Sequence, residues 1–257
     1  MVSLTGPVYR LYEKQLERSL DPARFPHHIG IILDGHRRYA RSAGLPDYTA
    51  AYRAGMAKFE NFLGWAEELE IPTITGWVLS TQNLDRPPEE LEPYFDVLIE
   101  LFARLPDLAS QYDMKIRVIG SLDLLPARLV AAAKQMEERR PTGSRRLNIA
   151  MGYGGHEEIA DAVRELVARL VTEGVPPEEI PTHITPETLS GHMYLSDLPN
   201  ADLIIRTSGE SRLSGFLLWQ SAYAEFSFVD VYWPAFRRID FFRSLREYGR
   251  RERRFGK

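Results

Sequence analysis

Short apolar runs alternate along this chain with longer stretches whose apolar residues recur at helical spacing, and this alternation constrains the fold most. Residues 29–33 form the first run, bounded by Pro26 and Gly35, which is typical of a buried strand in a parallel sheet. Further strands are expected at residues 74–79, 115–119, 147–151, 203–206 and 226–232. Helices are expected at residues 49–70, from Pro87 and Pro88 through residue 105, at 127–139 and at 157–172. The alternation predicts an α/β fold: a single domain with a mainly parallel central sheet of about six strands, flanked by helices.

The 257 residues suit one large domain or two small ones, and we favour one because the sequence holds no repeat, low-complexity tract or linker composition. Residues 174–186 are the only loose segment. Apolar residues from Val8 to Leu20 recur at helical spacing before Pro22. We therefore expect residues 1–25 to form an N-terminal helix that packs on the body, which spans residues 26–257.

Composition excludes several kinds of chemistry. The chain has no cysteine, so disulfides, thiolate metal sites and a cysteine nucleophile are excluded. The charged first 21 residues do not resemble a signal peptide, and no apolar stretch reaches membrane-spanning length, which predicts a cytoplasmic protein. The net charge of −4 argues against general nucleic-acid binding. Residues 237–257 nevertheless hold nine basic residues against three acidic ones, a local net charge of +6 that needs a role.

Polar clusters follow three of the expected strands, at residues 34–41, 80–86 and 206–215. Parallel strands bring their carboxyl ends to one edge of a sheet, so these clusters should form one rim around an apolar interior. Asp34, Gly35 and the arginines that follow suggest a diphosphate held with Mg²⁺. The alternative is that Asp34 caps a helix whose arginines face solvent.

Individual residues in and near these clusters leave alternatives open. Arg206 and Arg212 either bind an anion or form salt bridges to Asp202 or Glu210. Glu225 follows an apolar run and needs a metal or an arginine as partner. The apolar stripe of residues 91–105 either packs as core or lines a greasy pocket. Residues 156–158 read as the solvated start of a helix, and the absence of a P-loop lysine motif and a Gly-x-Ser-x-Gly elbow disfavours nucleotide hydrolysis and acyl transfer.

Taken together, the clusters resemble the cis-prenyltransferase family, which includes undecaprenyl diphosphate synthases and short-chain Z-farnesyl diphosphate synthases. The similarity covers roughly residues 26–257 and is most specific in the long run from Asp202 to Glu225. The other matching stretches are residues 28–41, 79–83, 152–159 and 232–236. The resemblance implies the cis-prenyltransferase fold and a Mg²⁺-dependent reaction that joins an allylic diphosphate to a C5 diphosphate, with dimethylallyl, geranyl or isopentenyl diphosphate as substrates.

The resemblance also implies roles for individual residues. Asp34 would bind Mg²⁺ and help the allylic diphosphate depart, while Gly35, Arg37 and Arg38 would hold that diphosphate. Arg206, Arg212 and Ser214 would hold the acceptor's diphosphate, with Arg86 assisting. Glu225 would complete the metal site, and Asn83 with Ser80 would relay the proton lost at the end. The remaining positions expected to contact substrate are His36, Tyr39, Tyr52, Thr81, Gln82, Leu84 and Leu213.

The family forms homodimers whose C-terminal Arg-x-Gly reaches the partner's active site, and Arg254-Phe255-Gly256 matches that motif. This gives the basic tail a role other than nucleic-acid binding. The alternative role is a solvated helix end that complements the helix dipole, and both roles are compatible.

The sequence departs from the family pattern in the clusters that handle the reacting ends. His36 stands where the family carries Asn, Tyr39 for Trp, and Gln82 for Glu, while Leu84 and Gly215 match short-chain members. These changes alter proton handling and local charge. We therefore favour a short-chain enzyme that performs irregular, head-to-middle coupling onto dimethylallyl diphosphate, giving a branched lavandulyl-type product.

Three other functions are weighed against head-to-middle coupling. The first is a regular head-to-tail Z-farnesyl diphosphate synthase that uses isopentenyl diphosphate. The second is a non-catalytic partner subunit, which the retained acid, amide and arginine positions disfavour. The third is phosphate-ester hydrolysis, which would leave the apolar stripe of residues 91–105 without a use.

Overall fold

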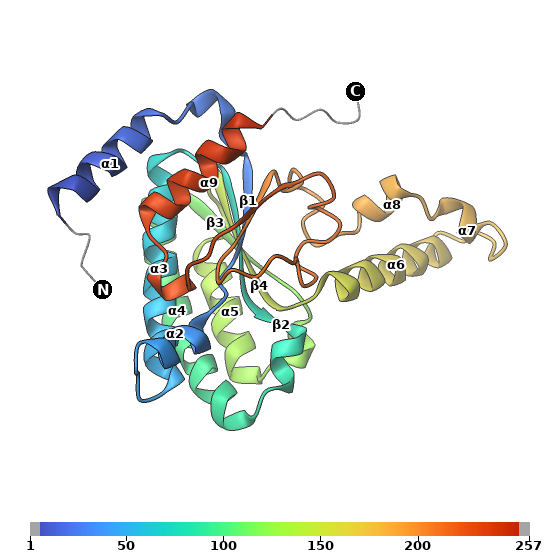
Figure 1. Ribbon diagram of the computed structural model, residues 1–257. Helices are drawn as coiled ribbons and strands as arrows, with labels where there is room; N and C mark the ends of the chain where they lie inside the picture. The colour runs from blue at the N-terminus through green and yellow to red at the C-terminus, as the bar shows by residue number, and fades with distance from the viewer. Residues whose placement is uncertain (1–5, 252–257) are drawn as a thin grey trace.

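Six parallel strands form the centre of the computed structural model, which describes residues 6–251 (Figure 1). The strands are β1 (His28–Ile32), β2 (Thr73–Ser80), β3 (Met114–Ile119), β4 (Arg145–Tyr153), β5 (Leu203–Arg206) and β6 (Glu225–Phe228). They are arranged in the order β3-β4-β2-β1-β5-β6, and every neighbouring pair is parallel. The predicted α/β fold with a six-stranded sheet is confirmed, and the sheet is wholly parallel.

Helices cover both faces of the sheet. The longer ones are α3 (Tyr48–Glu68), α4 (Pro88–Gln111), α5 (Ala127–Arg139), α6 (Gly155–Thr172) and α9 (Arg238–Arg250). The others are α1 (Pro7–Arg18), α2 (His36–Ser42), α7 (Ile180–His183) and α8 (Pro186–Ser190). Figure 1 shows α3, α4, α5 and α9 on one face, with α6, α7 and α8 on the other. No helix within residues 6–251 is long and apolar enough to cross a lipid bilayer.

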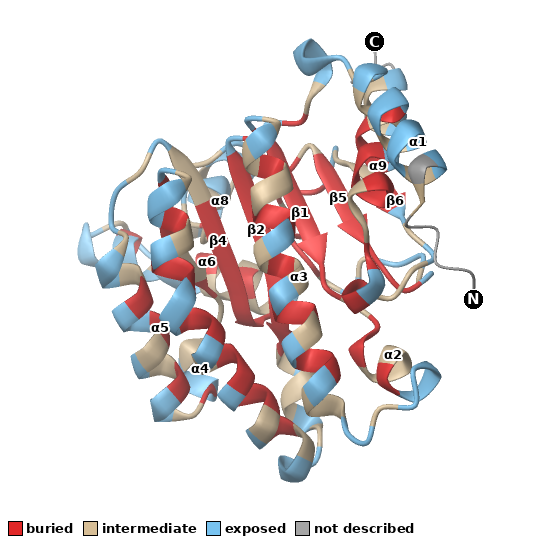
Figure 2. Cartoon of the chain, turned by 90° about the vertical axis from the view of Figure 1, so that its left-hand side faces the viewer, coloured by how far each residue is buried: buried red, intermediate tan, exposed pale blue. Residues whose placement is uncertain are grey.

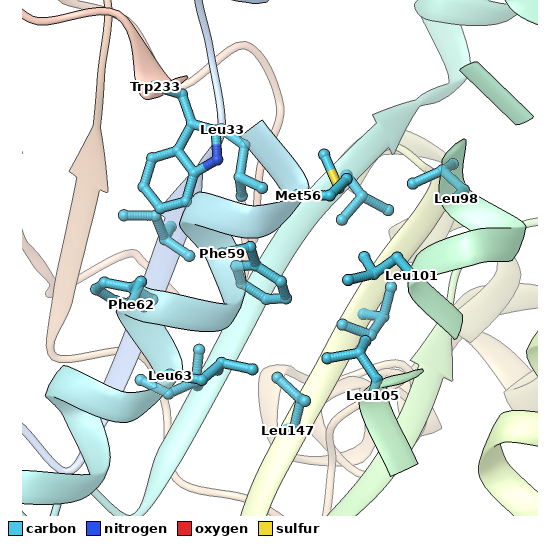
Figure 3. Close-up of a cluster of buried hydrophobic side chains, with 14 of the residues drawn as sticks. Leu33, Met56, Phe59, Phe62, Leu63, Leu98, Leu101, Leu105, Leu147 and Trp233 are labelled. Atoms are coloured by element: carbon cyan, nitrogen blue, oxygen red, sulfur yellow. The ribbon is translucent and has the colours of Figure 1, made fainter. Parts of the chain in front are cut away.

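The main core lies between the sheet and helices α3 and α4, whose buried sides face the strands (Figure 2). Met56 and Phe59 from α3 meet Leu98 and Leu101 from α4 above the strands, and all four are at most 1% exposed (Figure 3). The apolar stripe of residues 91–105 therefore packs as core, the first of the two alternatives left open by the sequence.

The basic C-terminal segment, which the sequence analysis described as a tail, forms helix α9 as far as residue 250. Its apolar side is buried at Phe241, Phe242 and Leu245. On its other side Arg238 forms ion pairs with three acids, Glu13 and Glu17 of α1 and Glu68 of α3. Part of the positive charge of this segment therefore balances acids of the same molecule.

Strand β6 ends four residues earlier than expected, at Phe228. The backbone that follows turns toward the loop after β5: the carbonyls of Val229 and Val231 accept hydrogen bonds from the N–H groups of Gly209 and Ser208, at 3.1 and 2.8 Å. These bonds stabilise the loop of residues 207–210 at the carboxyl edge of the sheet, where the polar clusters meet.

Candidate active site

The three polar clusters converge at the carboxyl edge of the sheet, as predicted. The register pairs Ile32 at the end of β1 with Arg206 at the end of β5, and β2 ends next to β1 at Ser80. The clusters surround a cavity of about 670 Å³. The predicted residues that line it are Asp34, Gly35, His36, Arg37, Arg38, Tyr52, Ser80, Gln82, Asn83, Arg86, Arg206, Arg212 and Ser214.

Other predicted residues lie elsewhere. Tyr39, Thr81, Leu84 and Leu213 do not line this cavity, and Glu225 is remote from it. Arg254 and Gly256 lie outside the described residues.

Gly35 allows the chain to turn from β1 into α2 at the edge of the cavity. Its φ of +106° is in the left-handed region, and a Cβ there would lie 2.8 Å from a ring carbon of Tyr232. A side chain at this position would be strained and would clash, so glycine is required.

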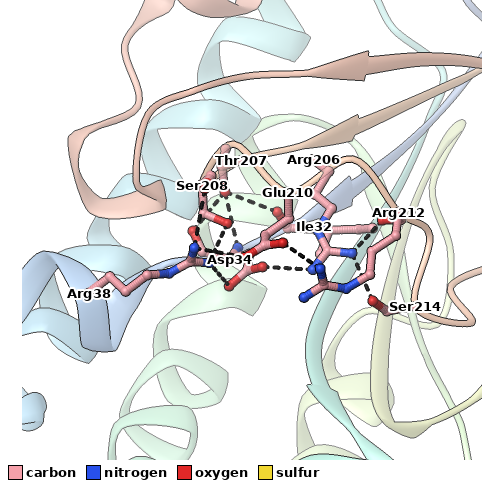
Figure 4. Close-up of polar contacts among 9 residues, drawn as sticks. All are labelled: Ile32, Asp34, Arg38, Arg206, Thr207, Ser208, Glu210, Arg212 and Ser214. Atoms are coloured by element: carbon pink, nitrogen blue, oxygen red, sulfur yellow. Dashed lines mark hydrogen bonds and ion pairs between the residues drawn. The ribbon is translucent and has the colours of Figure 1, made fainter.

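Asp34 is the acidic centre of the cavity (Figure 4). Its Oδ2 accepts a hydrogen bond from Arg206 Nη2 at 2.8 Å, and Arg38 Nη2 lies 3.4 Å from its Oδ1. Burial works to raise the pKa of this carboxyl, but hydrogen bonds from Arg206 and Ser208 and the charges of Arg206 and Arg38 outweigh it and hold the pKa below its usual value. Asp34 is therefore ionised at neutral pH.

Arginines from both sides of the cavity are held by carboxylates of the protein itself. Glu210 accepts from Arg38 at 2.9 Å and from Arg212 at 2.5 Å, so one acid joins two clusters. Arg206, 5% exposed, donates to Ser214 Oγ at 2.8 Å, to the Arg212 carbonyl and to Asp34. The salt bridge weighed for Arg212 with Glu210 is present, but Arg206 pairs with Asp34 rather than with Asp202 or Glu210.

Glu90 plays the corresponding part for Arg37 and Arg86, and the sequence analysis missed it. Its Oε1 lies 3.5 Å from Arg37 Nε and 3.3 Å from Arg86 Nη1, and it accepts from the Tyr52 hydroxyl at 3.1 Å. The available signal was its spacing, because Glu90 follows Arg86 by four residues at the start of an expected helix.

Ser80 and Asn83 lie together above the end of β2. The Ser80 hydroxyl accepts from the Asn83 N–H at 3.1 Å, and the Asn83 side-chain oxygen accepts from the Ser80 N–H at 3.4 Å. This reciprocal cap fixes both side chains at the wall of the cavity.

His36 is buried at the first turn of α2, with its ring against α3. Among residues 6–251 its Nε2 has no hydrogen-bond partner, and a Cβ at Gly55 would lie only 2.0 Å from that atom. Burial lowers the pKa of His36 to about 4, with the Asp34 charge opposing and the Arg86 charge adding to this effect. The imidazole is therefore neutral at pH 7 and adds no charge to the cavity.

Within this chain Glu225 lies at the other edge of the sheet from Asp34, so its expected part in the metal site stays a prediction. It is the first residue of β6 and pairs across the sheet with Leu203, whereas Asp34 follows the opposite end of β1. Its carboxylate accepts from Arg251, so its partner is the arginine of the two alternatives. Among residues 6–251 no three histidine, aspartate or glutamate side chains gather as a ready-made metal site.

Glu158 contradicts the expectation of a solvated helix start. It is 1% exposed and accepts hydrogen bonds from the Tyr194 N–H at 2.9 Å, from Gln220 Nε2 at 2.7 Å and from the Tyr153 hydroxyl. Burial raises its pKa despite these donors. The physical reason for the error is that three donors compensate the buried carboxyl, and two of them, Tyr194 and Gln220, come from segments further along the chain.

Comparisons with known proteins agree with this fold. Residues 32–256 match the family model described as putative undecaprenyl diphosphate synthase. The chain is 47% identical to an isoprenyl transferase of Thermus thermophilus over 100% of this chain and 98% of that one. It is 48% identical to a (2Z,6E)-farnesyl diphosphate synthase of Thermobifida fusca over 97% of each.

A solved structure is also similar: lavandulyl diphosphate synthase from Lavandula x intermedia in complex with dimethylallyl diphosphate, with a TM-score of 0.85 and 31% identity over 91% of this chain and 100% of that one. The six-stranded parallel α/β fold, its arginine-lined cavity around one carboxylate and these matches together identify the protein as a prenyltransferase. The chain belongs to the undecaprenyl diphosphate synthase family, the cis-prenyltransferases that its sequence resembles.

Proposed function

We propose that this prenyltransferase joins a short allylic diphosphate to isopentenyl diphosphate, head to tail, with Mg²⁺, and releases a short Z-isoprenyl diphosphate. The observation that carries the proposal is a single cavity in which arginines from three strand ends surround one ionised carboxylate. The relatives named (2Z,6E)-farnesyl diphosphate synthase and, in Mycobacterium bovis, short-chain Z-isoprenyl diphosphate synthase favour this regular coupling over the branched alternative.

The allylic substrate binds at the β1–α2 turn. Gly35 lets the backbone approach a diphosphate, and Arg37 and Arg38 supply fixed positive charge as the diphosphate leaves. Asp34 fits a Mg²⁺ site of the kind in which one carboxylate and substrate phosphate oxygens share the ion. Bound there, Mg²⁺ would neutralise negative charge on the departing diphosphate.

The acceptor's diphosphate binds on the other side, at Arg206, Arg212 and Ser214, with Arg86 nearby. In the free enzyme Glu210 and Glu90 occupy several of these donors, so a diphosphate exchanges with protein carboxylates rather than meeting bare arginines. Ser80 and Asn83 stand at the wall where they would accept and pass on the proton lost by the acceptor.

A short product fits in a cavity of this volume, about 670 Å³. The apolar lining of the cavity includes Ile32, Leu33 and Trp77. Tyr52 and Tyr94, whose ring centroids are 4.5 Å apart, also line it. The side chains of α3 and α4 beside it pack as core, which favours a short product over a long one.

Head-to-middle coupling onto dimethylallyl diphosphate is the second candidate. A specific observation favours it: Gln82 lines the cavity where the family carries an acid, so this cluster lacks a negative charge, and a buried neutral imidazole at His36 replaces an amide in the other cluster. The similarity to a lavandulyl diphosphate synthase that binds dimethylallyl diphosphate also favours it.

The deciding experiment supplies purified enzyme and Mg²⁺ with dimethylallyl or geranyl diphosphate, with and without isopentenyl diphosphate. An absolute requirement for isopentenyl diphosphate and a linear product support head-to-tail coupling. A branched product without isopentenyl diphosphate refutes it and supports the second candidate. Absence of turnover in the protein alone would favour a non-catalytic subunit. His36→Asn tests whether the histidine affects the product, because only head-to-middle coupling predicts that its product profile changes.

A homodimer is part of the proposal. Strand β6 is an edge of the sheet and carries Phe226 and Phe228, whose rings stack at 6.2 Å with Phe228 43% exposed. A second copy would cover this apolar edge. Sedimentation of the purified protein tests the dimer, and a Phe228→Glu variant should sediment as a monomer.

The cytoplasmic location expected from the sequence stays a prediction.

A further inference from the structure

Ser208 lies beside the active-site cavity without lining it. It is 6% exposed, and a Cβ added at Gly35 would lie 3.0 Å from the Cβ of Ser208. Ser208 therefore packs against the turn between β1 and α2, where the allylic diphosphate is expected to bind. Because it does not face the cavity, any effect of Ser208 on a substrate passes through its neighbours.

The backbone of Ser208 is strained. Its φ of +81° lies in the left-handed region, which side chains disfavour and glycine adopts freely. The loop fixes this conformation, because the N–H of Ser208 donates to the Val231 carbonyl at 2.8 Å and the N–H of Gly209 donates to the Val229 carbonyl at 3.1 Å. Glycine would meet the same constraint without strain, so the contacts of the serine side chain must offset the cost.

The Ser208 hydroxyl joins a guanidinium to a carboxylate. Its Oγ accepts a hydrogen bond from Arg38 Nη2 at 2.7 Å (Figure 4), and the hydroxyl donates to the carboxyl of Asp34. The same Arg38 nitrogen lies 3.4 Å from Asp34 Oδ1, so its stronger hydrogen bond goes to the serine. The hydroxyl thus mediates between two charged groups that would otherwise pair directly.

The other oxygen of Asp34 is already paired. Its Oδ2 accepts from Arg206 Nη2 at 2.8 Å, and Arg206 is 5% exposed. A Mg²⁺ ion that uses this carboxylate therefore competes with one direct arginine pair. A second direct pair, from Arg38 to Oδ1, would add to that competition and would also take the Arg38 charge away from the diphosphate.

We propose that Ser208 is a positioning residue of this site: its hydroxyl keeps Arg38 from pairing directly with Asp34, so that the carboxylate stays open to Mg²⁺ and the guanidinium to the allylic diphosphate. The inference rests on the proposed prenyl-transfer function. Without the hydroxyl, Arg38 pairs directly with Asp34, and binding of Mg²⁺ has to break two direct arginine pairs instead of one.

The test compares four proteins: wild type, Ser208→Gly, Ser208→Ala and Glu70→Gly. The glycine and alanine variants both lose the hydroxyl, but only glycine relieves the backbone strain at residue 208. Glu70→Gly is the matched control, because Glu70 is exposed, has a φ of +56° and precedes β2 at the opposite edge of the sheet from the cavity. Calorimetry measures the binding of geranyl diphosphate over a series of Mg²⁺ concentrations and in EDTA, and urea unfolding measures stability.

Both variants at residue 208 should need about ten times more Mg²⁺ for half-maximal binding of geranyl diphosphate, the effect of one hydrogen bond to a charged group. Binding in EDTA should change much less, because the other arginines are untouched. Ser208→Gly should unfold at a higher urea concentration than Ser208→Ala, which keeps the strain. Glu70→Gly should bind as the wild type does.

Two results would overturn the proposal. One is an unchanged Mg²⁺ requirement in Ser208→Gly, which would show that the hydroxyl does not act on the metal site. The other is an equal loss of binding in Mg²⁺ and in EDTA, which would show a general structural defect. If Ser208→Ala does not fold, Ser208→Gly, which lacks the strain, decides alone.

The two hypotheses fail differently. If the wild type binds geranyl diphosphate with Mg²⁺ but forms no prenyl product, the proposed function fails, and the Mg²⁺ requirement of Ser208→Gly still decides the role of Ser208. If the wild type is active and Ser208→Gly has the wild-type Mg²⁺ requirement, only the role of Ser208 fails. If the wild type does not bind geranyl diphosphate with Mg²⁺, both fail.

Discussion

The contact between His36 and Gly55 makes a sharp prediction about stability. The imidazole occupies the space that a side chain at Gly55 would need, with Nε2 at 2.0 Å and Cδ2 at 2.4 Å from the position of a Cβ. Helix α3 cannot shift away cheaply, because the Gly55 carbonyl accepts a hydrogen bond of 2.8 Å from the buried indole N–H of Trp233. Gly55→Ala should therefore be destabilising in the wild type.

The magnitude follows from two opposing effects. Replacing a glycine inside a helix by alanine is worth about 0.5–1 kcal/mol in stability. Overpacking a filled site costs about 1–3 kcal/mol. In the wild type the clash wins, and we expect a net loss of about 1 kcal/mol. In a His36→Ala background the clash is absent, so the same substitution should gain about 0.5–1 kcal/mol.

Urea unfolding of the four proteins of this double-mutant cycle measures the coupling, expected to be about 2 kcal/mol. Gly64→Ala is the matched control in the same helix, because a Cβ there would meet only the hydroxyl end of Tyr112, at 3.1 Å. It should behave the same in both backgrounds. Equal effects of Gly55→Ala with and without His36 would refute the placement of the ring.

Three further predictions concern charge. Arg206→Ala should lower the free energy of unfolding by about 2–3 kcal/mol, because Asp34 loses its closest partner in a half-buried site. Urea unfolding at pH 7 measures this loss. An unchanged midpoint of the unfolding curve would contradict the assigned pairing of Arg206 with Asp34. Burial raises the pKa of Glu158, so the folded protein keeps a proton that the unfolded chain releases, and stability falls as pH rises from the ordinary glutamate range through the folded pKa. The Glu158→Gln variant lacks this fall in stability. Relative to the wild type, its melting temperature should therefore rise from pH 4 to pH 7. A difference in melting temperature that stays constant between these pH values would rule out the raised pKa of Glu158. Chelating Mg²⁺ should abolish product formation. It should leave the melting temperature unchanged, because Arg206 and Arg38 already compensate the charge of Asp34. Turnover without a metal would exclude the proposed role of Asp34.

The fold was predictable because its signals are local. Helix α5 and strand β5 begin and end at the expected residues, since apolar period and flanking residues define each of them. Helix α9 was expected only as an alternative, a solvated helix end, because its apolar period at Ile239, Phe242 and Leu245 is interrupted by arginines whose partners come from α1 and α3. The partners of Arg238 lie 170 to 225 residues away in the sequence, so no local pattern reveals them.

The site was predictable to the extent that parallel strands share an edge. The convergence of Asp34, Ser80 and Arg206 follows from that rule alone. The same rule places Glu225 apart from them within one chain, since this residue begins a strand rather than following one and so lies at the other edge. The position of the His36 ring against Gly55 depends on how α2 packs on α3, which side-chain spacing does not determine.

The carboxylates that hold the arginines explain how this site can bind diphosphates and let them go. Arg37 and Arg86 share Glu90, Arg38 and Arg212 share Glu210, and Arg206 pairs with Asp34. An unpaired cluster of five arginines would repel itself in the free enzyme and hold an anionic product tightly. Because three internal acids pair with these five arginines, binding exchanges one anion for another, and release restores the original pairs. A prenyltransferase must release one diphosphate in every cycle. Internal acids that form ion pairs with the arginines again lower the free-energy cost of that release.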